Sequence, residues 1–145
     1  MPRSRISKQG VIELNNLTGR AVPAAFLKSV AAKVLLQEKK KGAGLSIVIA
    51  GEKLVLKLNR RYLNKSKVAN VLSFPFNSAQ GKLIPELGLG EVMLCPAEIR
   101  KNAKEYGISY KRAIAWMLIH GILHLLGYTH TQMTKKEKHY LSLTG

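Results

Sequence analysis

Residues 113–126 read AIAWMLIHGILHLL and form the most apolar stretch of this 145-residue chain. A helix that is apolar on every side lies at the centre of a domain. We therefore expect a buried central helix over Tyr110–Leu126, with Ser109 as its N-terminal cap. The stretch is too short to span a bilayer and contains two histidines.

Short β-branched segments and amphipathic segments alternate along the rest of the chain. Strands are expected at 10–15, 45–50, 71–75 and 91–95, and a loop is expected over Asn77–Gly88. Further helices are expected at 23–39, 54–62, 97–106 and 134–141. This interleaving predicts an α+β fold, with one domain over residues 1–145 and a mixed sheet covered by helices.

Three of the four histidines lie within residues 120–130, HGILHLLGYTH. His120 and His124 are four residues apart, so on a helix they share one face. Gly127 predicts the end of that helix and a turn that brings His130 back towards them. Three imidazoles with one position left open are typical of a catalytic zinc site, so one Zn²⁺ ion is expected. His139 is expected at the surface.

The composition of the chain limits the kind of metal site that it can form and the class of partner that it can bind. The chain has 24 Lys and Arg residues against eight acidic residues, a formal charge of +16, and every acidic residue is glutamate. Without clustered carboxylates, a two-magnesium nuclease site is excluded. The positive charge favours a nucleic acid partner over a membrane. Cys95 is the single cysteine, so no disulfide is expected, and the protein is expected to be cytoplasmic.

The residue after the first histidine decides between two kinds of metal hydrolase. Zinc proteases of the HExxHxxGxxH type need a glutamate there as general base, and this chain has Gly121. A phosphodiester fits better, because a metal ion can polarise a phosphoryl oxygen and RNA can supply its own 2′-hydroxyl.

The histidine segment closely resembles that of the YbeY family of bacterial endoribonucleases, whose pattern is HGxLHLxGYDH. Residues 58–62 (LNRRY) are similar to the family's LNxxY, residues 70–75 (NVLSFP) to its DVLSFP, and residues 89–92 (LGEV) to its LGDI. The likeness covers most of the chain from about Leu45 onwards.

This resemblance implies a mixed four-stranded sheet with about five helices, and zinc on the catalytic residues His120, His124 and His130. It implies cleavage of single-stranded RNA in the maturation of the 3′ end of 16S ribosomal RNA and in ribosome quality control. The implied partners are ribosomal RNA and the ribosomal subunit or its proteins.

The chain departs from the family pattern at four positions. Asn70, Glu91 and Thr129 replace aspartates, and Leu63 stands where the family has an arginine that contacts RNA. If the aspartate at 129 orients an imidazole, its loss would lower metal affinity by about 10–100-fold. Arg60 and Arg61 are candidates for the RNA contact; the alternative is that they form the solvated side of a helix.

Three functions are therefore compared. The first is a zinc-dependent endoribonuclease acting on ribosomal RNA. The second is a non-catalytic RNA-binding assembly factor with a structural metal, which Thr129 and Leu63 favour. The third is a zinc peptidase-like hydrolase, which Gly121 disfavours.

Overall fold

The computed structural model describes residues 10–76 and 88–144. The expected loop over 77–88 lies almost wholly outside the described residues. Four strands form one sheet in the order β1-β2-β4-β3. Their bounds are β1 Ile12–Asn16, β2 Leu45–Ile49, β3 Val71–Pro75 and β4 Gly90–Leu94. Strands β1, β2 and β4 are parallel and β3 is antiparallel to β4, so the predicted mixed four-stranded sheet is confirmed.

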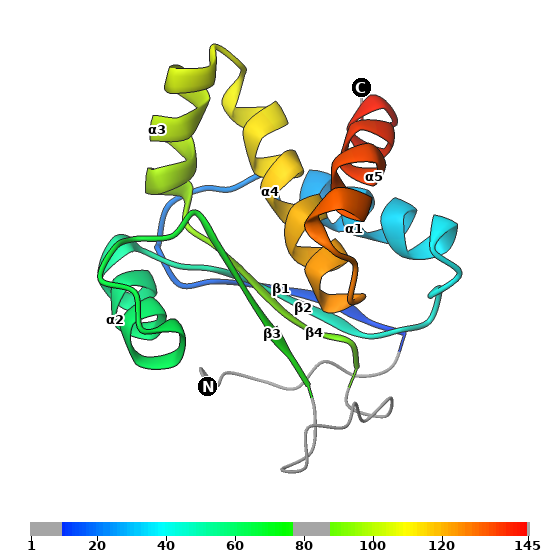
Figure 1. Ribbon diagram of the computed structural model, residues 1–145, viewed down its shortest axis with the longest axis horizontal. Coiled ribbons are helices and arrows are strands. Elements are labelled where there is room, and N and C mark those ends of the chain that lie inside the picture. The colour runs from blue at the N-terminus through cyan, green and yellow to red at the C-terminus, as the bar shows by residue number, and fades with distance from the viewer. Residues whose placement is uncertain (1–9, 77–87, 145) are drawn as a thin grey trace.

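The helices cover both faces of this sheet unequally. Their bounds are α1 Ala24–Gln37, α2 Glu52–Leu63, α3 Pro96–Tyr106, α4 Tyr110–Leu125 and α5 His130–Ser142. Figure 1 shows α1, α4 and α5 on one face, with α3 beside α4, and α2 on the other face. None of the helices within the described ranges is both long and apolar enough to cross a membrane.

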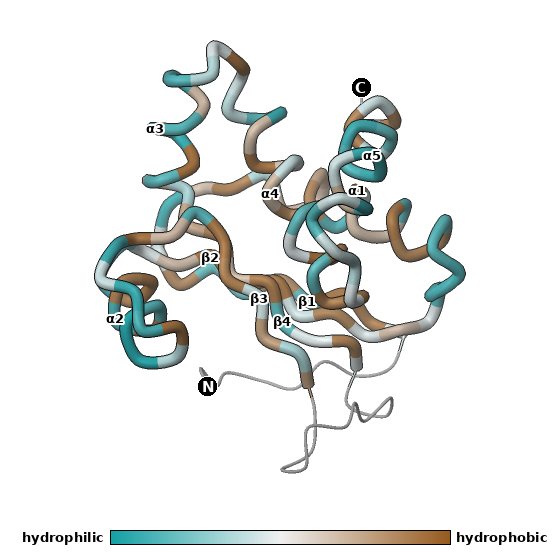
Figure 2. The backbone as a smooth tube through the Cα atoms, in the orientation of Figure 1, coloured by the Kyte–Doolittle hydropathy of each residue, from teal (hydrophilic) through white to brown (hydrophobic). Residues whose placement is uncertain are grey.

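The two faces of the sheet contribute to two separate apolar cores. Leu45, Ile47 and Ile49 of β2 alternate with Ser46 and Val48, as a strand that is buried on both sides requires. The first set packs with α1 and α4 in the larger core, whereas Val48 packs under α2 in the smaller one. Most of β2 and β3 is accordingly coloured as hydrophobic in Figure 2.

Helix α4 lies at the centre of the larger core, as its sequence predicted. It packs against α1, α3, α5, β3 and β4. Ser109 caps its first turn by accepting a hydrogen bond from the backbone N–H of Arg112 at 3.1 Å. Because α4 is held on every side, it is a rigid support for His120 and His124.

The last helix begins earlier than the sequence analysis expected. We predicted a start at Thr134, but α5 begins at His130 with Thr129 as its N-cap. The Thr129 hydroxyl accepts from the backbone N–H of Gln132 at 3.3 Å, and the Gln132 side chain accepts from the Thr129 N–H at 2.9 Å. This reciprocal capping box satisfies two donors that would otherwise lack partners, which fixes the helix start.

Candidate metal centre

The three histidines of residues 120–130 converge at the junction of α4 and α5. The ring centroids of His120 and His124 are 4.7 Å apart, those of His124 and His130 are 5.4 Å apart, and those of His120 and His130 are 6.3 Å apart. The first pair lies one turn apart on α4, and His130 is the first residue of α5. The structure therefore brings together all three predicted metal ligands.

The turn between the two helices has the geometry expected from Gly127. This glycine has φ +87°, and its N–H donates to His124 O at 3.0 Å. The N–H of Tyr128 donates to Leu123 O at 3.3 Å. These two bonds form a Schellman motif, in which a left-handed glycine reverses the chain. The reversal returns His130 to the side of α4 that carries the other two imidazoles.

The spacing of the rings suits a tetrahedral ion. A zinc ion about 2.0–2.1 Å from each nitrogen places two imidazole centroids roughly 5 Å apart, close to the separations found here. As the side chains stand in residues 10–76 and 88–144, no group of three or more His, Cys, Asp or Glu residues is arranged to hold a metal ion. The backbone nevertheless brings the three imidazoles to the spacing that a zinc ion needs. The rings would have to rotate for three of their nitrogens to point at one position.

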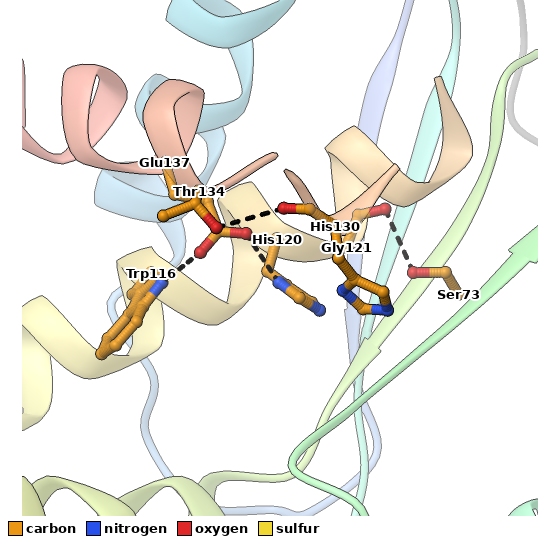
Figure 3. A network of polar contacts seen from close by, with 7 residues as sticks. All are labelled: Ser73, Trp116, His120, Gly121, His130, Thr134 and Glu137. Carbon is orange, nitrogen blue, oxygen red and sulfur yellow. Dashed lines mark hydrogen bonds and ion pairs between the residues drawn. The ribbon is translucent and has the colours of Figure 1, made fainter. Parts of the chain in front are cut away.

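A carboxylate beside the histidines was not found from the sequence. Glu137 Oε2 of α5 lies 2.8 Å from His120 Nδ1, and Trp116 Nε1 donates to Glu137 Oε1 at 2.6 Å. Figure 3 shows Glu137 held between the indole and the imidazole. Because an ionised carboxylate only accepts, the proton of neutral His120 lies on Nδ1, and its Nε2 is left as a ligand.

The spacing in the sequence indicates that Glu137 lies near the histidines once the bounds of α5 are known. Glu137 follows His130 by seven residues, so two turns of α5 place both on the same face. Trp116 precedes His120 by four residues, one turn earlier on α4. The expected start of the last helix at Thr134 concealed this relationship.

The charge state of His124 is set by its surroundings. Burial lowers the pKa of His124, and the neighbouring His120 and His130 lower it further, against an opposing effect of Glu137. A lowered pKa keeps the imidazole neutral at neutral pH, and the neutral form is the one that binds metal ions.

A second polar cluster, formed by Glu38, Tyr128, Lys136 and Tyr140, fixes α5 to α1. The hydroxyls of Tyr128 and Tyr140 donate to the Glu38 carboxylate, and Lys136 Nζ lies 3.0 Å from Glu38 Oε2. Burial would raise the pKa of Glu38, but these hydrogen bonds and the Lys136 charge outweigh it and lower the pKa. Because Tyr128 lies within the histidine segment, this cluster also holds the turn that leads to His130.

Gly121 lies where α4 approaches the sheet most closely. A Cβ atom at this position would lie 2.6 Å from Val92 Cγ1 and 3.2 Å from both Ser73 Oγ and Val71 Cγ2. Ser73 Oγ also donates to Gly121 O at 3.1 Å, as Figure 3 shows. A side chain at position 121 would therefore be directed against the sheet, and glycine itself supplies no general base.

Two hollows of about 300 Å³ each meet at His120. The first, between β3 and α4, is lined by His120, His124 and Leu63 among others. The second lies between α3 and α4 and is lined by His120 and Glu137 among others. His120 thus lines both hollows.

The candidate RNA-contacting arginines lie apart from these two hollows. Arg60 and Arg61 are exposed in the last turn of α2 and, with Lys53 and Lys57, line a separate shallow hollow on that helix. Leu63, at the position of the family's arginine, is 52% exposed beside His120 and His124. The nearest basic residues of α2 therefore do not replace that arginine in position.

The three changed aspartate positions have structural contacts of their own. Thr129 caps α5, a role in which threonine and aspartate are both favourable. Asn70 donates from Nδ2 to Asn102 Oδ1 at 2.9 Å, and the Oε1 atom of buried Glu91 accepts from Ser46 at 3.3 Å. The carboxylate beside the three histidines is instead Glu137, so the change at position 129 does not leave them without one.

Comparison with known proteins gives a consistent result. Residues 12–142 match the family described as Endoribonuclease YbeY. The chain is 33% identical over 127 residues to Endoribonuclease YbeY of Persephonella marina, covering 88% of this chain and 82% of that protein. It is 35% identical over 116 residues to Endoribonuclease YbeY of Psychromonas ingrahamii, covering 79% and 72%.

A solved structure shares the fold. The solution structure of TM1509 from Thermotoga maritima matches with a TM-score of 0.63 and 22% identity, covering 92% of this chain and 89% of that one. The sequence match extends over both helices that carry the histidines and over all four strands. The chain therefore belongs to the YbeY endoribonuclease family.

Proposed function

We propose that this chain is a zinc-dependent endoribonuclease that cleaves single-stranded RNA at the three-histidine centre. The observation that carries the proposal is the convergence of His120, His124 and His130, with Nδ1 of His120 directed at Glu137. A bound zinc ion would supply a Lewis acid that polarises a phosphoryl oxygen of the RNA.

The protein's own residues would prepare the centre for that ion. Glu137 would hold the protonated Nδ1 of His120 and so keep its Nε2 free as a ligand. The lowered pKa of His124, caused first by burial and then by the two neighbouring imidazoles, favours the neutral ligand. The two hollows that His120 lines would receive the strand around the scissile bond.

The substrate follows from charge and from family membership. The formal charge of +16 supports a polyanionic partner, because basic residues release counterions when they bind phosphates. We propose ribosomal RNA as the substrate, cleaved in maturation of the 16S 3′ end and in ribosome quality control. The corresponding partners are the ribosomal subunit and its proteins, and the corresponding location is the cytoplasm.

Metal analysis joined to an RNA cleavage assay tests this proposal. The wild type is expected to carry one zinc ion per chain and to cleave single-stranded RNA, and His124→Ala is expected to lose both properties. The matched control is His139→Ala, which removes the exposed fourth histidine that contacts Gln37 at 3.1 Å and leaves the centre unchanged.

The alternative outcomes separate the competing functions. Equal cleavage by metal-free His124→Ala would place the activity elsewhere. Full metal loading and RNA binding without cleavage would identify a non-catalytic RNA-binding factor. Peptide hydrolysis that depends on His120 would identify a peptidase-like hydrolase.

A further inference from the structure

The hollow between α3 and α4 has a composition that packing alone does not explain. It holds about 300 Å³ and shares His120 and Glu137 with the metal centre. Its apolar walls include Ile108 and Met117, which are only partly buried although both pack against the larger core. A cavity of this size is at the lower end of the range for small-molecule sites.

Two aromatic rings form one side of this hollow. Tyr106, the last residue of α3, is 70% exposed, the most exposed of the large hydrophobic side chains among the described residues. Its ring centroid lies 6.2 Å from that of Trp116, with the two planes inclined by 55°. A large aromatic side chain left open to solvent next to a cavity offers a flat apolar face to a ligand.

The polar groups of the hollow lie among these apolar walls. Two amide side chains line it, those of Asn70 and Asn102, and they are joined by a hydrogen bond of 2.9 Å from Asn70 Nδ2 to Asn102 Oδ1. Asn102 Nδ2 donates in turn to Glu105 Oε1 at 3.1 Å. This chain of contacts orients both amides, and amide groups pair with the hydrogen-bonding edges of nucleobases.

We propose that this hollow is a subsite for one unpaired nucleobase of the RNA, next to the scissile phosphate at the histidines. An aromatic face and oriented amides are the combination by which proteins hold single bases. The volume suits one base and excludes a base pair. A base can enter only when it is unstacked from its neighbours, so this subsite would make the enzyme act on single strands.

The proposal rests on the proposed function, because that function places the scissile phosphate at the histidines. The binding of a base can nevertheless be measured without cleavage. Trp116 is the only tryptophan of the chain, so tryptophan fluorescence reports on this hollow and on the adjoining Glu137. The probe is a three-nucleotide 2′-O-methyl RNA, which has no free 2′-hydroxyl to attack the phosphate. Three further probes lack the base of the first, second or third nucleotide.

The complete trinucleotide is expected to quench Trp116 fluorescence saturably, and one of the three abasic probes is expected to bind more weakly by about 5–100-fold. The Tyr106→Ala variant should bind the complete trinucleotide more weakly to a similar extent. It should bind that abasic probe with the same affinity as the wild type. Because Tyr106 is exposed, this variant keeps its fold. The control is Leu36→Ala, which truncates an exposed residue of α1 and should leave all affinities unchanged.

Equal quenching by the complete and all abasic probes would overturn the subsite, as would unchanged binding to Tyr106→Ala. His130→Ala separates this result from the proposed function. If His130→Ala and the wild type bind the base equally but neither cleaves RNA, the subsite stands and the proposed activity fails. If the wild type cleaves RNA, and neither a missing base nor the Tyr106→Ala substitution changes that cleavage, the proposed activity stands and the subsite fails.

Discussion

Glu137 Oε2 lies 2.8 Å from His120 Nδ1, although 17 residues separate the two in the chain. The other oxygen of the same carboxylate accepts from Trp116. Glu137 therefore connects α5 to α4 at His120, and it occupies the place in which a metal-binding histidine usually has a carboxylate or carbonyl partner.

Removal of this carboxylate should weaken metal binding. Glu137→Ala is expected to lower zinc affinity by about 10–100-fold, because the His120 ring loses the partner that fixes its proton on Nδ1. Glu137→Gln, which keeps an oxygen acceptor but no charge, should fall between this variant and the wild type. Competition with a chromogenic chelator measures the affinity. Glu98→Gln, on α3, is the control, and equal affinity of Glu137→Ala and the wild type would contradict the role.

The cap of α5 should contribute measurably to stability. Thr129→Ala is expected to lower the free energy of unfolding by about 1 kcal/mol, because the N–H of Gln132 loses its acceptor. Thr129→Asp should change it by only a few tenths of a kcal/mol, since aspartate also caps helices. Urea denaturation provides the measurement, with Thr131→Ala as the exposed control. A large gain in metal affinity for Thr129→Asp would show that position 129 acts on the imidazoles after all.

Position 121 should tolerate no side chain. Gly121→Ser is expected to destabilise the protein by about 1–3 kcal/mol, because the new Cβ atom would lie 2.6 Å from Val92 Cγ1 in a packed region. Gly51→Ser is the matched control, since no atom lies within 4 Å of a Cβ there and serine is favourable at that helix N-cap. Thermal denaturation compares the two, and equal melting temperatures would refute the close contact.

Stability should depend on the charge of Glu38 in acid. The pKa of Glu38 in the folded protein is below its ordinary value of 4.5, because three hydrogen bonds to the carboxylate outweigh the effect of burial. Its contribution is therefore complete above about pH 4.5 and is lost as the pH falls through the folded value. Glu38→Gln should be less stable than the wild type at pH 7, and the difference should shrink towards pH 3. A pH-independent difference in unfolding free energy would contradict this assignment.

An arginine placed beside the histidines should strengthen RNA binding. Leu63→Arg projects a cation into the hollow that His120 and His124 line, where the family pattern has an arginine. We expect tighter binding of single-stranded RNA and a salt dependence steeper by about 0.7 in the slope of log K against log salt concentration. Leu36→Arg adds the same charge on α1, away from the hollow, and should have a smaller effect. Equal effects of the two variants would indicate that only net charge matters.

Local patterns predicted the fold and the convergence of the three histidines, because the information for them is local. The spacing of His120 and His124 on a helix and the turn at Gly127 each depend on a few neighbouring residues. The four strands and five helices are confirmed, with differences of at most four residues at their ends and none for β3.

The parts that could not be predicted depend on contacts between distant segments. The partnership of Glu38 with Tyr128 spans 90 residues, and that of His120 with Glu137 spans two helices whose packing no local pattern specifies. The start of α5 could have been predicted from Thr129 and Gln132, which have the spacing of a capping box. The expected start at Thr134 is therefore wrong by four residues.

Helix α5 carries both His130 and Glu137, so the centre exists only while this helix is docked. Its buried anchors are few, namely Met133, Tyr140 and Leu141, and its polar contacts include those to Glu38 on α1 and those of Glu137 with α4. A local opening of α5 would remove one ligand and the carboxylate together while α4 and the sheet remain folded. The lifetime of the centre is then set by this local equilibrium, and an ion that binds all three imidazoles would slow hydrogen exchange in α5 more than in the rest of the chain.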